Sequence, residues 1–150
     1  MKKLFFLLTF SFVTALNATT FVSVGYGQTS EGHLANNNEK IDREYLKVTI
    51  GRLGYDTSHE RIAPYIDLGS TQHKEAVLGN LGISYAINNH FYLLGGIGIS
   101  KYIDDEESNY EEESKTNGNI NIIFINKNYG FMLGYDSDPK LVSANIVYRF

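Results

Sequence analysis

Hydrophobic and polar positions alternate with a period of two along most of the chain after residue 18. The alternation is found in eight segments, each with one large and almost wholly apolar face: 21–27, 45–51, 64–69, 80–87, 91–100, 119–125, 129–136 and 142–150. Successive side chains of a β-strand point to opposite faces, so this period predicts strands and not helices. Segment 119–125 is the least regular, because Ile123 and Ile125 are apolar on the otherwise polar face.

The connections between these segments are of two kinds. Residues 88–90 and 126–128 are tight, asparagine-rich turns, whereas 28–42 and 103–115 are long and polar. Short turns that alternate with longer loops are typical of an outer-membrane barrel. Two connections fit less well, since 53–62 is long for a turn and 72–75 is short for an outer loop; the flanking strands could extend into the former.

The length of the chain limits the size of the barrel. Eight strands of about ten residues use ~80 residues, which leaves enough of the 150 for seven connections. Eight is also the strand number at which side chains just fill the interior. We therefore expect an all-β fold, an eight-stranded antiparallel up-and-down transmembrane β-barrel.

The chemistry of the two faces suggests which one points outward. One face is large and apolar, and the other is rich in Gly, Ser, Asn and Thr and includes Lys47, Asp67 and Arg149. The second face suits a polar lumen better than a dry core. Aromatic residues near segment ends resemble interfacial girdles: Tyr26, Tyr85, Phe91, Tyr102, Tyr129, Tyr135 and Tyr148. The alternative is a soluble periplasmic barrel whose apolar face points inward around a lipophilic ligand.

Residues 1–18 have the three parts of a secretory signal peptide. Lys2 and Lys3 precede the short apolar stretch 4–13, and Ala18 offers a small residue at the cleavage site. An uncleaved signal anchor is the alternative, but the apolar stretch is short for one. We expect residues 1–18 to be removed, and residues 19–150 to form one barrel domain in a bacterial outer membrane with both termini in the periplasm.

The last segment carries the most specific motif of the chain. An outward row ends at Phe150 and resembles the C-terminal signal that outer-membrane assembly machinery recognises: Val142, Ala144, Ile146, Tyr148 and Phe150. Together with the strand–turn–strand pattern of 80–100, it resembles small OmpA-like, OmpX-like and opacity-type outer-membrane barrels. That resemblance implies eight strands, contact with the assembly machinery and no shared catalytic residues. Members of these families include adhesins and proteins with structural roles.

Composition narrows the chemistry further. Cysteine is absent, which excludes disulfides and thiolate sites, and the net charge of −4 argues against a nucleic-acid partner. An acidic run in the second long loop comprises Asp104, Asp105, Glu106, Glu107, Glu111, Glu112 and Glu113. We interpret it as a solvated surface loop. Its carboxylates could instead capture Ca²⁺ or Mg²⁺ weakly, bridge to lipopolysaccharide phosphates or contact a cationic partner.

The histidines argue against an enzyme. Lipid A deacylases of this size share a His-x-Ser pair on a late strand, and none of His33, His59, His73 and His90 fits it. The string Ser58-His59-Glu60 would place the histidine on the opposite face of a strand from its neighbours. We expect no catalytic residue, no cofactor and no metal ion, although a lipid A-modifying enzyme stays as an alternative.

Charges on the predicted lumen face should be paired, because an unpaired charge in a low-dielectric interior is costly. We expect the pairs Lys47–Asp67 and Asp136–Arg149, with Tyr45, Tyr65 and Tyr92 filling the remaining space. The sequence thus favours an integral outer-membrane barrel with a closed lumen and a structural or surface-interaction role carried by loops 28–42 and 103–115. Outer-membrane lipid and lipopolysaccharide would surround a monomer. A narrow channel is the main alternative.

Overall fold

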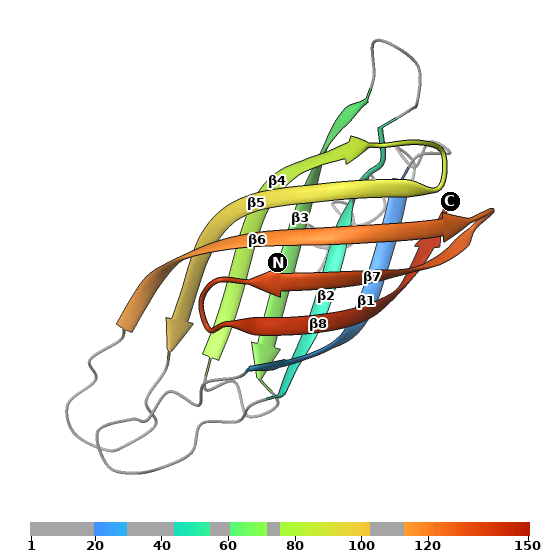
Figure 1. The fold of residues 1–150 in the computed structure, drawn as a ribbon. Helices are drawn as coiled ribbons and strands as arrows, with labels where there is room; N and C mark the ends of the chain where they lie inside the picture. Colours follow the sequence, from blue (N-terminus) through green and yellow to red (C-terminus); the bar gives the residue numbers. More distant parts are fainter. Residues whose placement is uncertain (1–19, 30–43, 55–60, 72–75, 103–112) are drawn as a thin grey trace, which may run out of the picture.

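The structure is a computed structural model that describes residues 20–29, 44–54, 61–71, 76–102 and 113–150. These residues form eight strands (Figure 1): β1 Thr20–Thr29, β2 Glu44–Arg52, β3 Ile62–Thr71, β4 Ala76–Ala86, β5 Phe91–Tyr102, β6 Glu113–Asn126, β7 Tyr129–Asp136 and β8 Leu141–Arg149. In the part of the chain that the structure describes, no helix is both long and apolar enough to cross a membrane.

The strands form a closed up-and-down barrel in which every strand is antiparallel to its two neighbours. Closure occurs between β1 and β8, where Val24 lies opposite Ile146, and the Phe150 amide donates to the Thr20 carbonyl at 3.0 Å. We call the end with Thr20, Phe150 and the turns 87–90 and 127–128 the turn end. The opposite end, where β1, β3, β5 and β7 finish, is the loop end. The predicted fold class is confirmed.

The turns at the turn end are held by local backbone chemistry. The Asn88 side-chain oxygen accepts hydrogen bonds of 2.9 Å from the amides of His90 and Phe91, as asparagine does in tight turns. Lys127 has a φ of 59°, the left-handed conformation that a two-residue hairpin connection requires. These asparagine-rich sequences therefore reverse the chain in the way their composition predicts.

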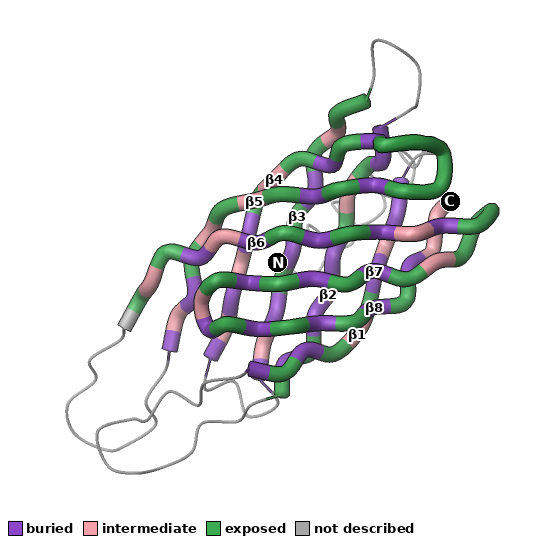
Figure 2. The backbone as a smooth tube through the Cα atoms, in the orientation of Figure 1, coloured by how far each residue is buried: buried purple, intermediate pink, exposed green. Residues whose placement is uncertain are grey.

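Burial alternates along every strand, as the purple and green bands of Figure 2 show. The outward side chains are large and apolar, with Ile97 at 76% and Ile146 at 75% exposure. A water-soluble barrel would turn this face inward, so the alternative of a soluble lipophile-binding barrel does not fit the structure. An apolar outer belt is instead the arrangement of a barrel surrounded by lipid.

Two elements differ from the sequence prediction in their extent. β6 begins at Glu113, so Lys115 lies within a strand and not in the loop 103–115. β1 continues to Thr29, so Gln28 also belongs to a strand. β2 ends at Arg52 and β3 begins at Ile62, which leaves 53–61 as a connection. Polar residues at strand ends carry no apolar alternation, so the pattern alone could not mark these boundaries.

Candidate functional site in the lumen

A buried lysine lies at the centre of the loop-end half of the lumen. The β2 residue Lys47 is fully buried, and its ammonium Nζ lies 2.8 Å from Asp67 Oδ2 on β3 and 2.5 Å from Asp136 Oδ2 on β7. The pair Lys47–Asp67 is therefore present as the sequence suggested. Lys47 faces inward because Leu46 and Val48, on either side of it, belong to the apolar outer row.

Both carboxylates also accept hydrogen bonds from side chains of other strands, including strands across the lumen. Asp67 accepts from Thr49 Oγ1 at 2.9 Å and from Asn119 Nδ2 at 2.8 Å. Asp136 Oδ1 accepts from Asn80 and Asn117, both at 3.0 Å. We call this group the Lys47 cluster: Lys47, Thr49, Asp67, Asn80, Asn117, Asn119 and Asp136. Every member is buried, as a desolvated ion cluster must be if its charges are to be compensated.

Tyr65 extends the cluster across the barrel. Its hydroxyl donates to Asn119 Oδ1 at 2.8 Å, and the ring is almost completely buried. Gly82 and Gly96 make this path possible, because an added Cβ would lie 2.6 Å from Tyr65 Cε1 at Gly82 and 2.7 Å from Tyr65 Oη at Gly96. These lumen glycines are therefore required by close approach of a side chain.

The turn-end half of the lumen is apolar. We call this group the turn-end plug: Phe21, Leu53, Tyr65, Ala86, Tyr92, Leu94, Ile123, Ile125, Met132 and Val147, all buried. Seven of the eight strands contribute a member, and Leu53 directly follows β2, so the plug fills the cross-section and does not line one wall. A smaller apolar group, Tyr45, Ala76, Leu78, Tyr102 and Leu141, lies at the loop end. The lumen is thus layered, with the charges between two apolar groups.

Three polar side chains lie beside the boundary between the Lys47 cluster and the plug. Asn121, Ser143 and Asn145 are buried, and they carry polar atoms that bond no other described group. Asn145 also donates to Ser23 Oγ at 3.4 Å. Polar groups of this kind in protein interiors are usually bonded by ordered water.

The expected pair Asp136–Arg149 is wrong. Asp136 lies opposite Leu141 at the loop end of β7, whereas the Arg149 amide bonds the Asn128 carbonyl at the turn end, 2.7 Å away. The Arg149 guanidinium donates instead to the Lys127 carbonyl. The two residues lie on adjacent strands but at opposite ends of them, so Lys47 compensates both carboxylates.

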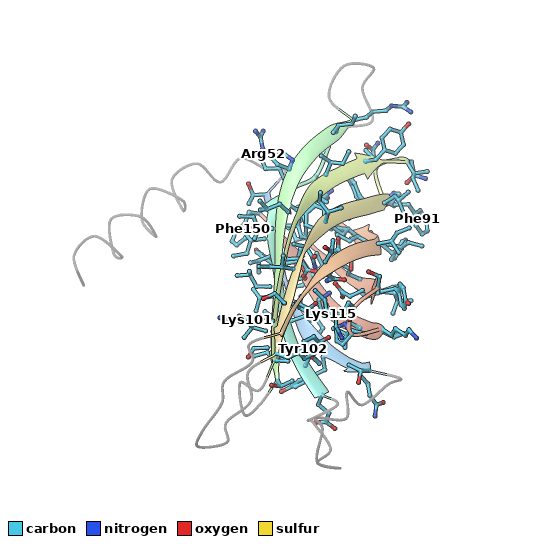
Figure 3. The ribbon with its side chains drawn as sticks, turned by 90° about the vertical axis from the view of Figure 1, so that its left-hand side faces the viewer. Arg52, Phe91, Lys101, Tyr102, Lys115 and Phe150 are labelled. Carbon is cyan, nitrogen blue, oxygen red and sulfur yellow. The ribbon has the colours of Figure 1, made fainter. Side chains whose placement is uncertain are left out.

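The proposed C-terminal assembly row lies on the outer surface. Val142, Ala144 and Ile146 are exposed, and Tyr148 and Phe150 continue the row to the turn end. The Tyr148 ring lies 5.0 Å from Phe150 and 5.1 Å from Tyr129, which forms an aromatic cluster there. In Figure 3, Phe150, Phe91 and Arg52 lie toward the end opposite Lys101, Tyr102 and Lys115. The assembly role itself stays a prediction.

The other predicted residues are less informative. Asp104, Asp105, Glu106, Glu107, Glu111 and Glu112 lie outside the described residues, and of Glu113 only the strand backbone is described. His33, His59 and His73 also lie outside them. His90 is exposed in a turn, with Nδ1 3.0 Å from the Ile125 carbonyl oxygen. Within the described ranges, no three His, Cys, Asp or Glu side chains are grouped so as to hold a metal ion.

Sequence reasoning missed most of the turn-end plug and the asparagines of the cluster. Ile123 and Ile125 interrupt the polar face in the sequence, and both are fully buried in the plug. A signal was available, because apolar residues on a polar lumen face near one strand end indicate a dry segment of the lumen. Asn80 and Asn117 both lie opposite Gly98 of β5, and Asn119 lies opposite Gly96. No local sequence pattern relates these asparagines of β4 and β6 to one lysine.

No family model and no curated protein matches this sequence. Among solved structures, the chain is similar to one described as "De novo design of transmembrane beta-barrels", with a TM-score of 0.54 and 16% identity over 89% of this chain and 96% of that chain. It is also similar to Ail, the attachment invasion locus protein of Yersinia pestis, solved with the heparin analogue sucrose octasulfate. That match has a TM-score of 0.47 and 17% identity over 87% of this chain and 97% of that chain. The protein has the fold of a small eight-stranded transmembrane β-barrel.

Proposed function

We propose that this protein is an integral outer-membrane barrel of a Gram-negative bacterium that forms no through-channel and acts through the loops at its loop end. The observation that carries the proposal is the closure of the lumen by two kinds of layer, the Lys47 cluster and the turn-end plug. If the lumen transports nothing, the loops at the loop end are the part of the protein that can give it a specific role. Binding residues concentrate on loops that a rigid scaffold displays.

The plug is the main argument against a channel. Leu94, Ile123 and Met132 are fully buried within it, and an ion that crossed them would lose its hydration without gaining a polar partner. The Lys47 cluster adds a second obstacle, because its ammonium and carboxylates are already bonded to one another. We therefore favour a closed barrel over a narrow channel.

The orientation follows from the two ends. At the turn end, two of the three connections are short, β1 begins and β8 ends there, and the outer surface carries an aromatic cluster. Outer-membrane barrels have short turns on the periplasmic side and longer loops outside. We propose that the turn end is periplasmic and that residues 30–43 and 103–112 belong to extracellular loops. Surrounding lipid and lipopolysaccharide and the assembly machinery are the partners this placement implies.

We also propose that the protein is not an enzyme and needs no cofactor. The charged side chains of the lumen are fully buried and bonded to one another: Lys47, Asp67 and Asp136. A substrate could not reach them without displacing the plug or the cluster. A lipid A-modifying activity would need a nucleophile and a base within hydrogen-bond reach on the outer surface. Mass spectrometry of lipid A from cells with and without the protein should give identical acylation.

The first experiment combines conductance with topology. Refolded protein in a planar bilayer should give no stepwise current; discrete steps would contradict the closed lumen. Because the chain has no cysteine of its own, a single cysteine introduced by substitution is the one site that a maleimide can label. On intact cells, Ser114→Cys at the loop end should react with a membrane-impermeant maleimide, whereas Asn89→Cys at the turn end should react only after permeabilisation. The reverse labelling would overturn the orientation.

The loop role needs a separate test. Replacing residues 104–112, or 30–43, by a short Gly-Ser linker should leave heat-modifiable migration on detergent gels unchanged, because the described strands supply the barrel contacts. The same replacements should abolish adhesion of expressing cells to host-cell or matrix-coated surfaces, if wild-type cells adhere. Loss of the folded band would show that a loop is part of the barrel, and unchanged adhesion would place binding elsewhere.

A further inference from the structure

The buried charges of the Lys47 cluster do not cancel. Among the residues that the structure describes, the fully buried charged side chains are one ammonium, Lys47, and two carboxylates, Asp67 and Asp136. Lys47 is shared by both carboxylates, so one negative charge is left over when both are ionised. An uncompensated charge in a low-dielectric interior is costly. The lumen therefore needs one further positive charge.

Hydrogen-bond donors surround the two carboxylates. Asp136 Oδ2 faces the lysine ammonium, and Oδ1 accepts from the amides of Asn80 and Asn117. These nitrogens donate and do not accept hydrogen bonds, so a proton on Asp136 would have no acceptor among them. Asp67 Oδ1 differs, because its partner is the Thr49 hydroxyl, which can accept as well as donate. A proton could thus remove the extra charge only at Asp67 Oδ1.

A second group of buried polar atoms lies on β6 and β8. Asn121 Oδ1, Ser143 Oγ and Asn145 Oδ1 bond no other described group, although the three residues are between 1% and 3% exposed. Gly134 of β7 lies between Asn121 and Ser143 in register. An added Cβ at Gly134 would lie 2.1 Å from Asn121 Oδ1 and 2.8 Å from Ser143 Oγ. Both oxygens therefore border the space over the bare inward face of Gly134.

This space adjoins the charged residues. Asp136 follows Gly134 by two positions on β7, so both residues face the lumen. Asn145 lies in one register row with Gly25 of β1 and Lys47 of β2. An added Cβ at Gly25 would lie 2.2 Å from Asn145 Oδ1, so this oxygen leans toward the lysine side of the row. The three oxygens thus border the Lys47 cluster.

The charge and the three oxygens together restrict what occupies this space. Water would bond the oxygens, as in other protein interiors, but would leave the negative charge. A proton on Asp67 would remove the charge but would leave the oxygens without a partner. A monovalent cation does both, because the oxygens bind it and it balances the second carboxylate. A divalent cation would only reverse the sign of the imbalance.

We infer that the lumen binds one monovalent cation of the Na⁺ type at Asn121, Ser143 and Asn145, beside Asp136. Amide and hydroxyl oxygens are the hard ligands that such ions take. A water molecule that completes the coordination can accept from Asn121 Nδ2, which also bonds no described group. The ion is a structural charge partner without a catalytic role. Its ligands are neutral, so no run of acidic residues in the sequence indicates the site.

The test measures how folding depends on Na⁺. The protein is folded into vesicles of zwitterionic phosphatidylcholine and unfolded in urea at two NaCl concentrations that differ tenfold, with choline chloride keeping the ionic strength constant. If only the folded state holds one ion, the ratio of folded to unfolded protein rises by up to tenfold. We expect a rise of several-fold for the wild type. A ratio that does not change would mean that water and a proton replace the ion, and would overturn the inference.

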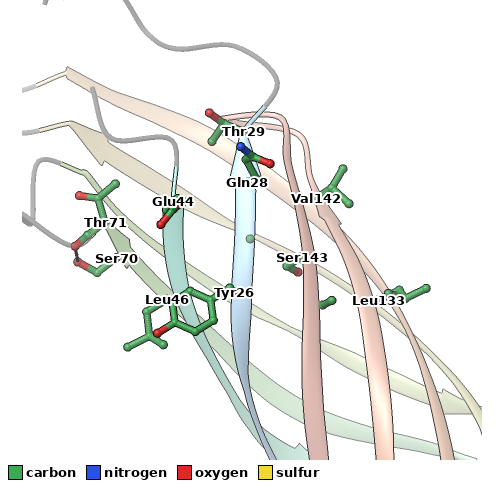
Figure 4. Close-up of a pocket in the computed structure, with 12 residues that line it drawn as sticks. Tyr26, Gln28, Thr29, Glu44, Leu46, Ser70, Thr71, Leu133, Val142 and Ser143 are labelled. Carbon is green, nitrogen blue, oxygen red and sulfur yellow. Dashed lines mark hydrogen bonds between the residues drawn. The ribbon is translucent and has the colours of Figure 1, made fainter. Parts of the chain in front are cut away.

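Substitutions assign the effect to the site. Asn121→Leu keeps a branched side chain but removes a ligand, and Asp136→Asn removes the extra negative charge, so both should abolish the Na⁺ dependence. The matched control is Glu44→Gln. Glu44 is the one acidic residue among the described residues that line a pocket of about 1130 Å³ at the loop end (Figure 4). Glu44→Gln should keep the wild-type dependence. Retention of the dependence by the lumen variants, or its loss in Glu44→Gln, would place the ion elsewhere and overturn the inference.

A variant that does not fold is recognised first, by its heat-modifiable migration. Ser143→Ala removes a single hydroxyl and carries the test if the other two lumen variants fail to fold. It should reduce the Na⁺-dependent rise, and an unchanged rise in Ser143→Ala would then contradict the site. These measurements involve neither the orientation of the barrel nor its loops. The inference can therefore fail while the results of conductance and cysteine labelling still support the proposed function.

Discussion

The two halves of the lumen close the same barrel by different physical means. Toward the loop end, Lys47 compensates Asp67 and Asp136, and amide and hydroxyl groups bond the remaining carboxylate oxygens. Toward the turn end, apolar side chains such as Leu94 and Ile123 fill most of the cross-section, and the buried polar groups beside them, such as Ser84, are uncharged. The first half depends on every charge keeping its partner, whereas the second depends only on volume and shape.

This difference predicts opposite responses to substitution. In the Lys47 cluster, removing one charge should be worse than removing all of them, because the remaining charges stay buried. In the turn-end plug, each truncation should add a cavity, and two truncations at residues that do not touch each other should cost about the sum of each.

The largest effect is expected for Lys47→Met. The substitution keeps the length of the side chain but leaves Asp67 and Asp136 buried without a cation, which should cost about 3–5 kcal/mol. The measurement is the free energy of unfolding in urea, with protein folded into lipid vesicles. The matched control is the triple variant Lys47→Met, Asp67→Asn, Asp136→Asn, which removes all three charges and should regain most of the loss. A triple variant as unstable as Lys47→Met would refute the charge-pairing account.

A smaller effect is expected in the plug. Leu94→Ala removes a fully buried side chain and should cost about 2–3 kcal/mol through lost burial and an unfilled cavity. The neighbouring Leu93 points outward and is 36% exposed, so Leu93→Ala should cost less in the same urea titration. If both truncations cost the same, the turn-end lumen is not a close-packed core and the two halves do not differ as argued.

The sequence predicted the fold more completely than the site, for a physical reason. Strand alternation is local, so the eight strands and the outward face of residues such as Ile97 and Ile146 follow from neighbouring positions alone. The same local alternation predicts that Lys47 lies in the lumen, where its ion pair with Asp67 is present. Which lumen residues share a height depends on strand register and tilt, and these are set by closure of the whole barrel.

Asp136 and Arg149 illustrate that limit. Both were placed on adjacent strands, but a hairpin brings the last residues of its first strand opposite the first residues of its second. Asp136 precedes the turn that β8 follows, so it faces Leu141, and Arg149 lies at the other end. Counting residues outward from the turn at 137–140 places Asp136 next to the turn and Arg149 nine residues beyond it, so the two side chains cannot meet. No comparable count would have shown that Asp136 meets Lys47, because β7 and β2 are not neighbours.

The smallest effect is expected at Tyr65, the residue that belongs to both halves. Its ring is part of the turn-end plug, and its hydroxyl donates to Asn119 of the Lys47 cluster. Tyr65→Phe keeps the ring and removes only this hydrogen bond, so it should cost about 1 kcal/mol.

Double-mutant cycles for Tyr65→Phe test whether the halves are separate. Asn119 donates to Asp67, which binds Lys47, so the effects of Tyr65→Phe and Lys47→Met should not be additive. Tyr65→Phe and Leu94→Ala should be additive within about 0.5 kcal/mol, because the lost hydroxyl does not contribute to plug packing. Coupling to Leu94 that equals coupling to Lys47 would mean that one continuous core, and not two distinct layers, closes the lumen.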